Sequence, residues 1–373
     1  MSWEMIIGQQ RVKALLQRAV QQERIAHAYL LHGPEGTGKD ALAIEFAKVL
    51  NCTKGESSAC DECQSCKRFE TLQHPNVKLI IALPVGKSEK QGDDPIAALS
   101  VDQISTVQEQ MALKARDPYH RISLPKANFI KINSVREIKR QSALTRSQEG
   151  RKVFIISRAE QMNDEAGNSL LKTLEEPLAD TVLILTTSER ARLLPTIVSR
   201  CQLVQCDPLQ EGEIEDALRT REQAEPGQAK LAARMSGGSY TIARDLLSKD
   251  MMSERAEVVA FLRVALGNHK VALVSTVEAI VASRDKPGLE RWLKLLQSWI
   301  REALVLTEGG VEIGLDEDRA TLQNFVKKFP SANLVAAQGA IEAGIAHLNK
   351  NVYLPLVLLN LAFTLRSTLS QEA

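Results

Sequence analysis

The sequence predicts an α/β fold, in which a parallel sheet is flanked by helices, followed by a second part that is wholly helical. Short apolar runs of strand length alternate with helical patterns through the N-terminal half of the chain. These runs are continuously apolar, which is typical of parallel strands covered on both faces. After Pro208 the pattern becomes helical. The two parts of the chain are therefore expected to differ in architecture.

The elements of the first half follow one another in a regular order. Apolar residues recur at helical spacing from Val12 to Val20, and AYLLHG at residues 28–33 is expected to form a buried strand. A second helical pattern covers residues 39–50. This alternation predicts helices on both faces of the sheet. The other expected strands are VKLIIAL, KVFIIS and TVLILTT, at residues 77–83, 152–157 and 181–187.

Length and composition limit the class of protein. The chain has 373 residues, of which 44% are hydrophobic and 25% charged, enough to bury a core in each of two or three domains. Lys and Arg number 47 against 46 Asp and Glu, so the net charge is +1 and the chain as a whole is no polycation for nucleic acid. The N-terminal residues lack a basic run followed by an apolar stretch, and no segment has the unbroken apolar length that a bilayer requires. A cytoplasmic location is expected.

A glycine-rich stretch, HGPEGTGKD at residues 32–40, lies between the first strand and the next helix. In a P-loop the backbone N–H groups of such a turn cradle phosphate oxygens, a Lys reaches the outer phosphates, and a Ser or Thr ligates Mg²⁺. Asp40 stands where that hydroxyl is expected. The pattern predicts binding of ATP or ADP, and the alternative is a glycine-rich turn with no ligand. The candidate contacts are Gly33, Pro34, Gly36, Thr37, Gly38, Lys39 and Asp40.

Four of the six cysteines, Cys52, Cys60, Cys63 and Cys66, lie close together in the sequence. In a cytoplasmic chain this spacing indicates a tetrahedral thiolate site rather than disulfides. Four thiolates leave no position for water, so a structural Zn²⁺ is expected. An iron–sulfur cluster is the rival interpretation, although the usual following Cys-Pro pattern is missing. Four unrelated buried thiols are a weaker alternative, because ESSACDECQSCKRFE is too polar to form core.

Several motifs in combination resemble a known family. They are IIGQQ and RIAHAYLLHGPEGTGKD, the cysteine cluster after the next helix, GRKVFIISRAEQMNDEAGNSLLKTLEEP, and LLPTIVSRCQLVQCDPL. Over about residues 5–250 the sequence resembles the AAA+ subunits of the bacterial DNA polymerase III clamp loader. The resemblance implies an AAA+ P-loop core with a parallel sheet and an inserted zinc module, then a helical lid and an all-α collar. The expected domains are 1–208 for the core, with the zinc module at about 51–70 and an insertion at about 84–128, 209–250 for the lid, and 251–373 for the collar.

The strand at residues 152–157 departs from the family pattern. In the family this strand ends in Asp-Glu, which hold the Mg²⁺ shell and orient the attacking water; here Ser157 and Arg158 follow KVFII. Neither side chain can perform those tasks. Thr241 also stands where the motor subunits carry a sensor-2 Arg. Loss of the chain's own ATPase is expected, which favours a ring-completing subunit. The alternatives are an ATP-hydrolysing gamma/tau-type subunit and a zinc-ribbon nucleic-acid-binding module on an AAA+ scaffold.

The SRC motif at residues 199–201, in contrast to the end of the strand at 152–157, indicates a part in ATP hydrolysis. In the family the Arg of this motif reaches the ATP of the neighbouring subunit, so the resemblance implies that Arg200 is an arginine finger acting in trans. The alternative is an ordinary surface Arg at a helix end. The expected partners are gamma/tau and delta subunits, the sliding clamp and primed DNA, with no membrane.

A basic helix is expected at residues 134–144. Val135 and Ile138 form its inner face, while Arg136, Lys139 and Arg140 share an outer one. The resemblance implies that these cations contact DNA phosphates inside the ring, and a plain solvated face is the alternative. The insertion at 84–128 has a helical segment near Val101 to Lys114, and its sequence indicates no function.

Overall fold

The structure is a computed structural model that describes residues 2–84, 92, 94–97, 99–143, 149–176, 180–247, 251–267, 269–309, 319–348 and 352–370. The chain forms two compact units, Met1–Ile214 with Gly238–Ile242, and Glu215–Gly237 with Ala243–Ala373. The finer division into core, lid and collar stays a prediction.

The first unit contains a five-stranded parallel sheet with the strand order β2-β3-β4-β1-β5. The α/β class and the four predicted strands are confirmed, although β2 is shorter than the apolar run that predicted it. The sequence did not predict β5, because three of its four residues are exposed and form no continuous apolar run. The strands are β1 Ala28–His32, β2 Val77–Ile80, β3 Lys152–Ile156, β4 Thr181–Thr187 and β5 Gln202–Gln205.

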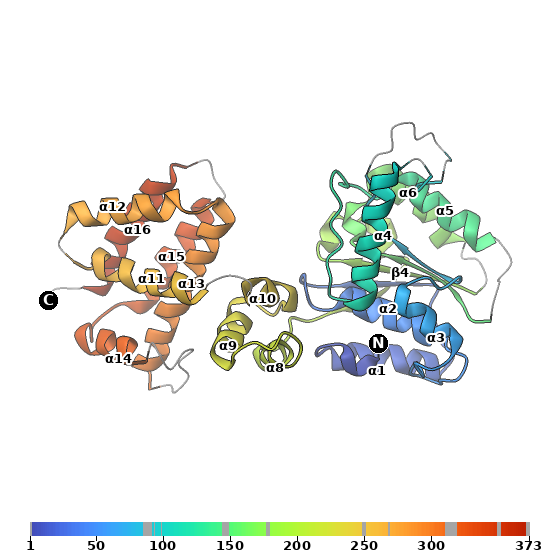
Figure 1. Ribbon diagram of the computed structural model, residues 1–373, viewed down its shortest axis with the longest axis horizontal. Coiled ribbons are helices and arrows are strands. Elements are labelled where there is room, and N and C mark those ends of the chain that lie inside the picture. Colours follow the sequence, from blue (N-terminus) through green and yellow to red (C-terminus); the bar gives the residue numbers. More distant parts are fainter. Residues whose placement is uncertain are drawn as a thin grey trace. The chain divides into compact units, whose positions relative to one another are not determined.

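Helices cover both faces of this sheet (Figure 1). On one face, Leu30, Phe154 and Leu183 pack with buried side chains of α5 and α6 in one apolar cluster. On the other, Tyr29 of β1 meets Phe46 of α2 edge to face. The helices of this unit are α1 Gln10–Gln21, α2 Lys39–Val49, α3 Gln64–Arg68, α4 Val101–Arg116, α5 Ile132–Ala143, α6 Asp164–Glu175 and α7 Pro195–Val198, with 3₁₀ turns at Trp3–Met5, Phe69–Thr71, Ala159–Gln161 and Arg190–Arg192.

The insertion contains one well-formed helix, as its sequence predicted. Ser100 caps α4 by accepting a hydrogen bond from the N–H of Gln103, whose side chain accepts one from the N–H of Ser100 in return. This reciprocal cap fixes where the helix begins. Residues 85–91, 93 and 98 of the insertion lie outside the described residues.

From Glu211 onward every described element is helical, as the sequence predicted. The core of the second unit is built on Trp292 and Trp299 of α13, which are buried and meet Phe261 and Phe325 edge to face. No helix in the described part of the chain is long and apolar enough to cross a membrane. The helices are α8 Glu211–Arg221, α9 Pro226–Met235, α10 Tyr240–Leu247, α11 Met251–Ala265, α12 Lys270–Ala282, α13 Lys286–Thr307, α14 Arg319–Lys328, α15 Leu334–Leu348 and α16 Leu354–Leu369.

A buried ion pair joins three helices of the second unit. Arg255 of α11 donates to Glu302 of α13 at 2.6 Å, and both side chains are only 2% exposed. Arg234 of α9 lies 3.4 Å from the same carboxylate. Because removing one partner leaves buried charge uncompensated, this pair holds the helices in one arrangement.

We expect Glu302→Ala to lower the free energy of unfolding by about 3–5 kcal/mol, because two guanidinium groups would lose their buried anion. Urea denaturation followed by circular dichroism measures the change. Glu290→Ala on the same helix is the matched control, since Glu290 forms a surface pair with Lys294 at 2.8 Å and should contribute less than about 1 kcal/mol. Equal effects of the two substitutions would show that the buried pair has no special role.

Candidate functional site

The glycine-rich loop at residues 32–40, named the phosphate-binding loop for the role predicted above, lies at the carboxyl end of β1, where the sequence places it. Gly33 has a φ of +149°, and a Cβ there would lie 2.0 Å from the carbonyl oxygen of Cys206. Gly38 has a φ of +90°, and its Cβ would lie 2.9 Å from the hydroxyl of Tyr119. Both positions therefore require glycine, because the backbone conformation and the space exclude a side chain.

Lys39 begins α2 and points into the loop. Its Nζ donates to the carbonyl oxygens of Gly33 at 2.8 Å and Pro34 at 2.5 Å. Thr37 also donates to Pro34, and Gly36 accepts from the backbone N–H of Tyr240. Burial lowers the pKa of Lys39, partly offset by acidic groups around it. The ammonium is bonded only to neutral carbonyls by these contacts, so its charge faces the loop without a bonded anion.

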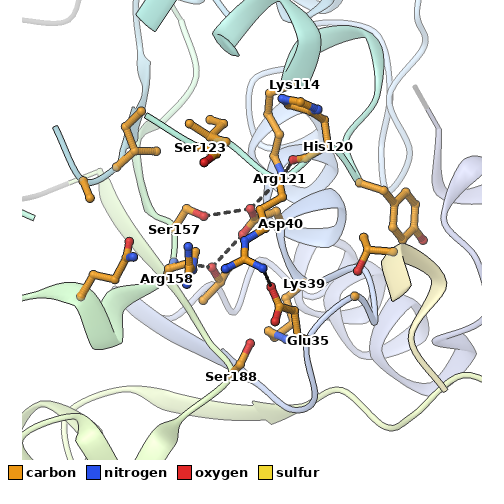
Figure 2. Close-up of a pocket in the computed structure, with 18 of the residues that line it drawn as sticks. Glu35, Lys39, Asp40, Lys114, His120, Arg121, Ser123, Ser157, Arg158 and Ser188 are labelled. Atoms are coloured by element: carbon orange, nitrogen blue, oxygen red, sulfur yellow. Dashed lines mark hydrogen bonds and ion pairs between the residues drawn. The ribbon is translucent and has the colours of Figure 1, made fainter. Parts of the chain in front are cut away.

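Asp40, the residue that departs from the P-loop pattern, is held by three donors. Ser157 donates to Oδ2 at 2.8 Å, Thr186 donates to Oδ1 at 2.7 Å, and Nζ of Lys114 lies 2.8 Å from Oδ2 (Figure 2). Burial by itself would raise the pKa of Asp40, but the Lys114 charge and these hydrogen bonds together hold the pKa below its usual value. Asp40 is thus a carboxylate at neutral pH.

Relative to the P-loop pattern, a hydroxyl and a carboxylate have changed places. Position 40 carries the acid and position 157 the hydroxyl, and the two side chains bond to each other. Arg158, beside Ser157, has a left-handed backbone with a φ of +54°. Glu160 is buried and is not among the residues that line the cavity described next. No described carboxylate therefore takes the water-orienting position at the end of β3.

A cavity of about 380 Å³ opens above the loop (Figure 2). Its lining includes Lys39 and Asp40, which the sequence singled out, and Arg158. Lys114 and Arg121 come from the insertion and were missed by the sequence analysis. The missed residues gave no sequence signal, because a Lys and an Arg in a polar insertion are indistinguishable from solvated charges.

Tyr119 of the insertion closes one side of the loop region. Its hydroxyl accepts a hydrogen bond from the backbone N–H of Ile7 at 2.8 Å. Its ring meets Tyr240 edge to face, with centroids 4.9 Å apart. Arg121 forms an ion pair of 2.9 Å with Glu35 of the loop. The stretch after α4, which had no assigned function, is therefore a cover over the phosphate-binding loop.

The four clustered cysteines come together in space. Their Sγ atoms all lie within 4.8 Å of one another, and Cys60 and Cys66 are 3.9 Å apart. A zinc ion bound at about 2.3 Å by four thiolates separates neighbouring sulfurs by about 3.8 Å. The donor set and its spacing can therefore hold a metal ion of that kind.

Backbone amides prepare this cluster for a cation. Cys52 accepts from the N–H groups of Gly55 and Cys60, and Cys63 accepts from that of Cys66. Burial would raise the pKa of Cys63, but these hydrogen bonds and those to Thr53 bring it down to about 5. Burial raises the pKa of Cys66, and the neighbouring thiols raise it further. The crowded thiols therefore differ in how readily they lose a proton. A bound metal ion would stabilise the thiolate form of all of them, because its charge offsets theirs.

The structure places Arg200 between α7 and β5. One guanidinium nitrogen lies 2.8 Å from Oε1 of Glu175, at the end of α6, and the other donates to the carbonyl oxygen of Thr196 at 3.0 Å. The Arg200 side chain is 36% exposed and that of Glu175 is 50% exposed. Arg200 thus lies at the surface of the first unit, paired with a half-exposed carboxylate.

The basic residues of α5 lie where the helical pattern puts them. Val135 and Ile138 are buried against the sheet, while Lys139 and Arg140 are exposed and Arg136 is partly buried. Arg140 pairs with Glu137 of the same helix at 2.7 Å. These three basic residues therefore bring positive charge to the outer face of α5, where Arg140 is paired with an acidic neighbour.

Comparison with known proteins identifies relatives over most of the chain. A family model described as DNA polymerase III, delta subunit, matches residues 8–210. The DNA polymerase III subunit delta' of Bacillus subtilis is 35% identical over 265 residues, or 70% of this chain and 67% of the relative. The delta' subunit of Pseudomonas aeruginosa is 31% identical over 329 residues, or 84% and 83%. Among solved structures, a DNA polymerase III gamma subunit-related protein from Thermotoga maritima is 14% identical and covers 95% of this chain and 99% of its own, with a TM-score of 0.42.

The gamma/tau-type relatives match less of the sequence than these two delta' subunits do. The tau subunit of Bacillus subtilis is 30% identical over 201 residues, which is 54% of this chain and 28% of that protein. The predicted resemblance to clamp-loader subunits is confirmed, and delta' is a better match than the gamma/tau alternative. This chain therefore belongs to the DNA polymerase III delta' family of clamp-loader subunits.

Proposed function

We propose that this chain completes the clamp-loader ring without hydrolysing ATP itself and supplies Arg200 to the ATP site of a neighbouring gamma/tau-type subunit. The observation that carries the proposal is the end of β3, where Ser157 donates to Asp40 and, among the described residues, no further carboxylate is placed to orient water. The chain keeps a phosphate cradle but lacks the groups for hydrolysis. The partly exposed position of Arg200 at the surface supports the complementary role.

The other contacts of the assembly follow from the same role. The expected partners are gamma/tau and delta subunits, the sliding clamp and primed DNA, within the DNA polymerase III holoenzyme in the cytoplasm. Arg136, Lys139 and Arg140 on α5 are proposed to contact DNA phosphates, which would hold the duplex without reading its sequence. Cys52, Cys60, Cys63 and Cys66 are proposed to bind one structural Zn²⁺, which would hold the module after α2 in shape.

We expect no steady ATP hydrolysis by the isolated chain, because Ser157 and Arg158 cannot replace the two missing acids. Phosphate release measures this, with Lys39→Ala defining the background. Adding gamma/tau-type and delta subunits, clamp and primed DNA should then give DNA-stimulated hydrolysis that depends on this chain. Turnover by the isolated native chain that disappears in Lys39→Ala would contradict the proposal and restore the gamma/tau alternative.

A further inference from the structure

We propose that the cavity at the phosphate-binding loop binds a polyphosphate chain without magnesium, with the ammonium of Lys114 taking the electrostatic role of the divalent cation. The cation-binding positions of a P-loop are here residues 40 and 157, and both are engaged. Ser157 donates a hydrogen bond to Asp40, and the ammonium of Lys114 forms an ion pair with Oδ2 of Asp40. One internal cation therefore lies at the place where the P-loop pattern puts the metal ligands.

Mg²⁺ does not fit these residues. It requires near-octahedral oxygen ligands at about 2.0–2.1 Å and gives up its water reluctantly. The only described acid at the two positions, Asp40, already accepts from Ser157, Thr186 and Lys114. A magnesium ion on Asp40 would face the Lys114 ammonium across one carboxylate, and the two cations would repel each other.

Lys114 is built into the fold rather than placed by chance. Its side chain is 4% exposed, and Nζ also donates to the carbonyl oxygen of His120 at 2.9 Å. It comes from α4, whose start is fixed by the reciprocal cap at Ser100. The Lys114 ammonium therefore has a fixed position, and no cation has to bind there from solution.

The charge of the cavity favours an anion. Lys114 balances Asp40 and Arg121 balances Glu35, at 2.8 Å and 2.9 Å. Lys39 and Arg158 also line the cavity. Arg158 lies 3.9 Å from the buried carboxylate of Glu160, whereas Lys39 is bonded to neutral carbonyls, so Lys39 supplies the excess positive charge. A volume of about 380 Å³ accommodates a phosphate chain, which would also face the N-terminus of α2. The phosphate chain could belong to ATP or ADP or be free tripolyphosphate, which share this chemistry.

This inference goes beyond the proposed ring function and does not depend on it. The ring function requires Arg200 and the loss of hydrolysis, neither of which depends on what occupies the loop. Binding is therefore measured on the isolated full chain, so that its failure would leave the action of Arg200 in trans untouched.

The test is calorimetric titration of the native chain with ATP, ADP and tripolyphosphate, in EDTA and again in excess Mg²⁺. We expect binding in EDTA that is at least as tight as in Mg²⁺. Tripolyphosphate as tight as ATP would assign the site to the phosphate chain alone, and tighter ATP would add a contact to the nucleoside. Binding that requires Mg²⁺, or no binding of any of the three in EDTA, would overturn the proposal.

Substitutions distinguish a specific role of Lys114 in binding from a general effect of positive charge on the helix. Lys114→Met should weaken binding in EDTA by about tenfold or more, because a desolvated cation beside the phosphates is lost. Arg116→Met, which removes an exposed cation from the same helix, is the matched control and should change little. The double variant Asp40→Ser with Lys114→Met removes both charges and restores the P-loop hydroxyl, so it remains informative if the single variant unfolds. It should bind more tightly in Mg²⁺ than in EDTA, and binding that stays independent of Mg²⁺ would overturn the role of Lys114.

Discussion

Replacing Arg200 with alanine should leave the isolated chain folded but lower ATP hydrolysis at the neighbouring site of the ring by well over tenfold. A guanidinium beside a transferring phosphoryl group offsets charge that develops in the transition state, and such fingers accelerate hydrolysis by about 10³ to 10⁵. Arg200 contacts a half-exposed Glu175 and one carbonyl group, and surface pairs of this kind stabilise a fold by at most about 1 kcal/mol. Thermal unfolding of the variant should therefore be nearly normal.

The measurement is DNA-stimulated ATPase and clamp loading by the reconstituted complex. Total activity should fall by less than the loss at one site, because the other sites keep their own fingers. Arg200→Lys should restore only part of the activity, since an ammonium lacks the planar fork of a guanidinium. Arg192→Ala is the matched control, because Arg192 is exposed and pairs with Glu189 in the same way. Clamp loading at the normal rate by the Arg200→Ala complex would reduce Arg200 to a surface residue.

Removing the proposed zinc, or replacing Cys63 with serine, should unfold the segment around α3. Metal analysis of the native chain should find about one zinc per chain. Closed thiolate sites couple metal binding to folding, with apparent binding free energies of about 10–16 kcal/mol in small zinc modules. The effect on this segment should therefore exceed that of any single surface substitution. Glu56→Ala, an exposed residue of the same loop, is the control and should leave zinc content and stability unchanged.

Limited proteolysis with and without chelator, followed by return of zinc, would measure this loss and its reversal. Visible absorption distinguishes the rival metal site, because an iron–sulfur cluster is coloured and a zinc site is not. A chain that contains no metal and resists proteolysis equally with and without chelator would rule out a structural metal.

The sheet could be predicted from sequence where strands are buried on both faces. β1, β3 and β4 are continuous apolar runs, and their bounds matched within about a residue. β5 could not be predicted in this way, because it lies at the edge of the sheet and only Val204 is buried. Its position depends on pairing with β1, which no local pattern in QLVQ reports.

The residues of the candidate site also fall into those that could be predicted from the sequence and those that could not. Local spacing predicted the glycine loop and the four cysteines, because a short stretch of chain supplies all their groups. Lys114, Tyr119 and Thr186 were missed, since they reach the loop only through the tertiary fold. Asp40 was recognised as a departure from the pattern, but its meaning depends on Lys114, which approaches it from a helix distant in the sequence.

The first few residues of the chain provide a second connection between the cysteine loop and the cover over the phosphate-binding loop, besides α2, whose Lys48 pairs with Asp61. The indole N–H of Trp3 donates to the carbonyl oxygen of Ser57, within the cysteine loop, at 3.1 Å. The N–H of Ile7, four residues later, holds the hydroxyl of Tyr119 over the phosphate-binding loop, and Lys13 anchors the carbonyl oxygen of Ile6 between them. These N-terminal contacts couple the position of the cysteine loop to that of Tyr119 over the phosphate-binding loop. If the four cysteines bind the proposed zinc, part of its binding free energy would therefore keep the aromatic cover in place, and the shape of the cavity at the loop would depend on an ion that does not touch it.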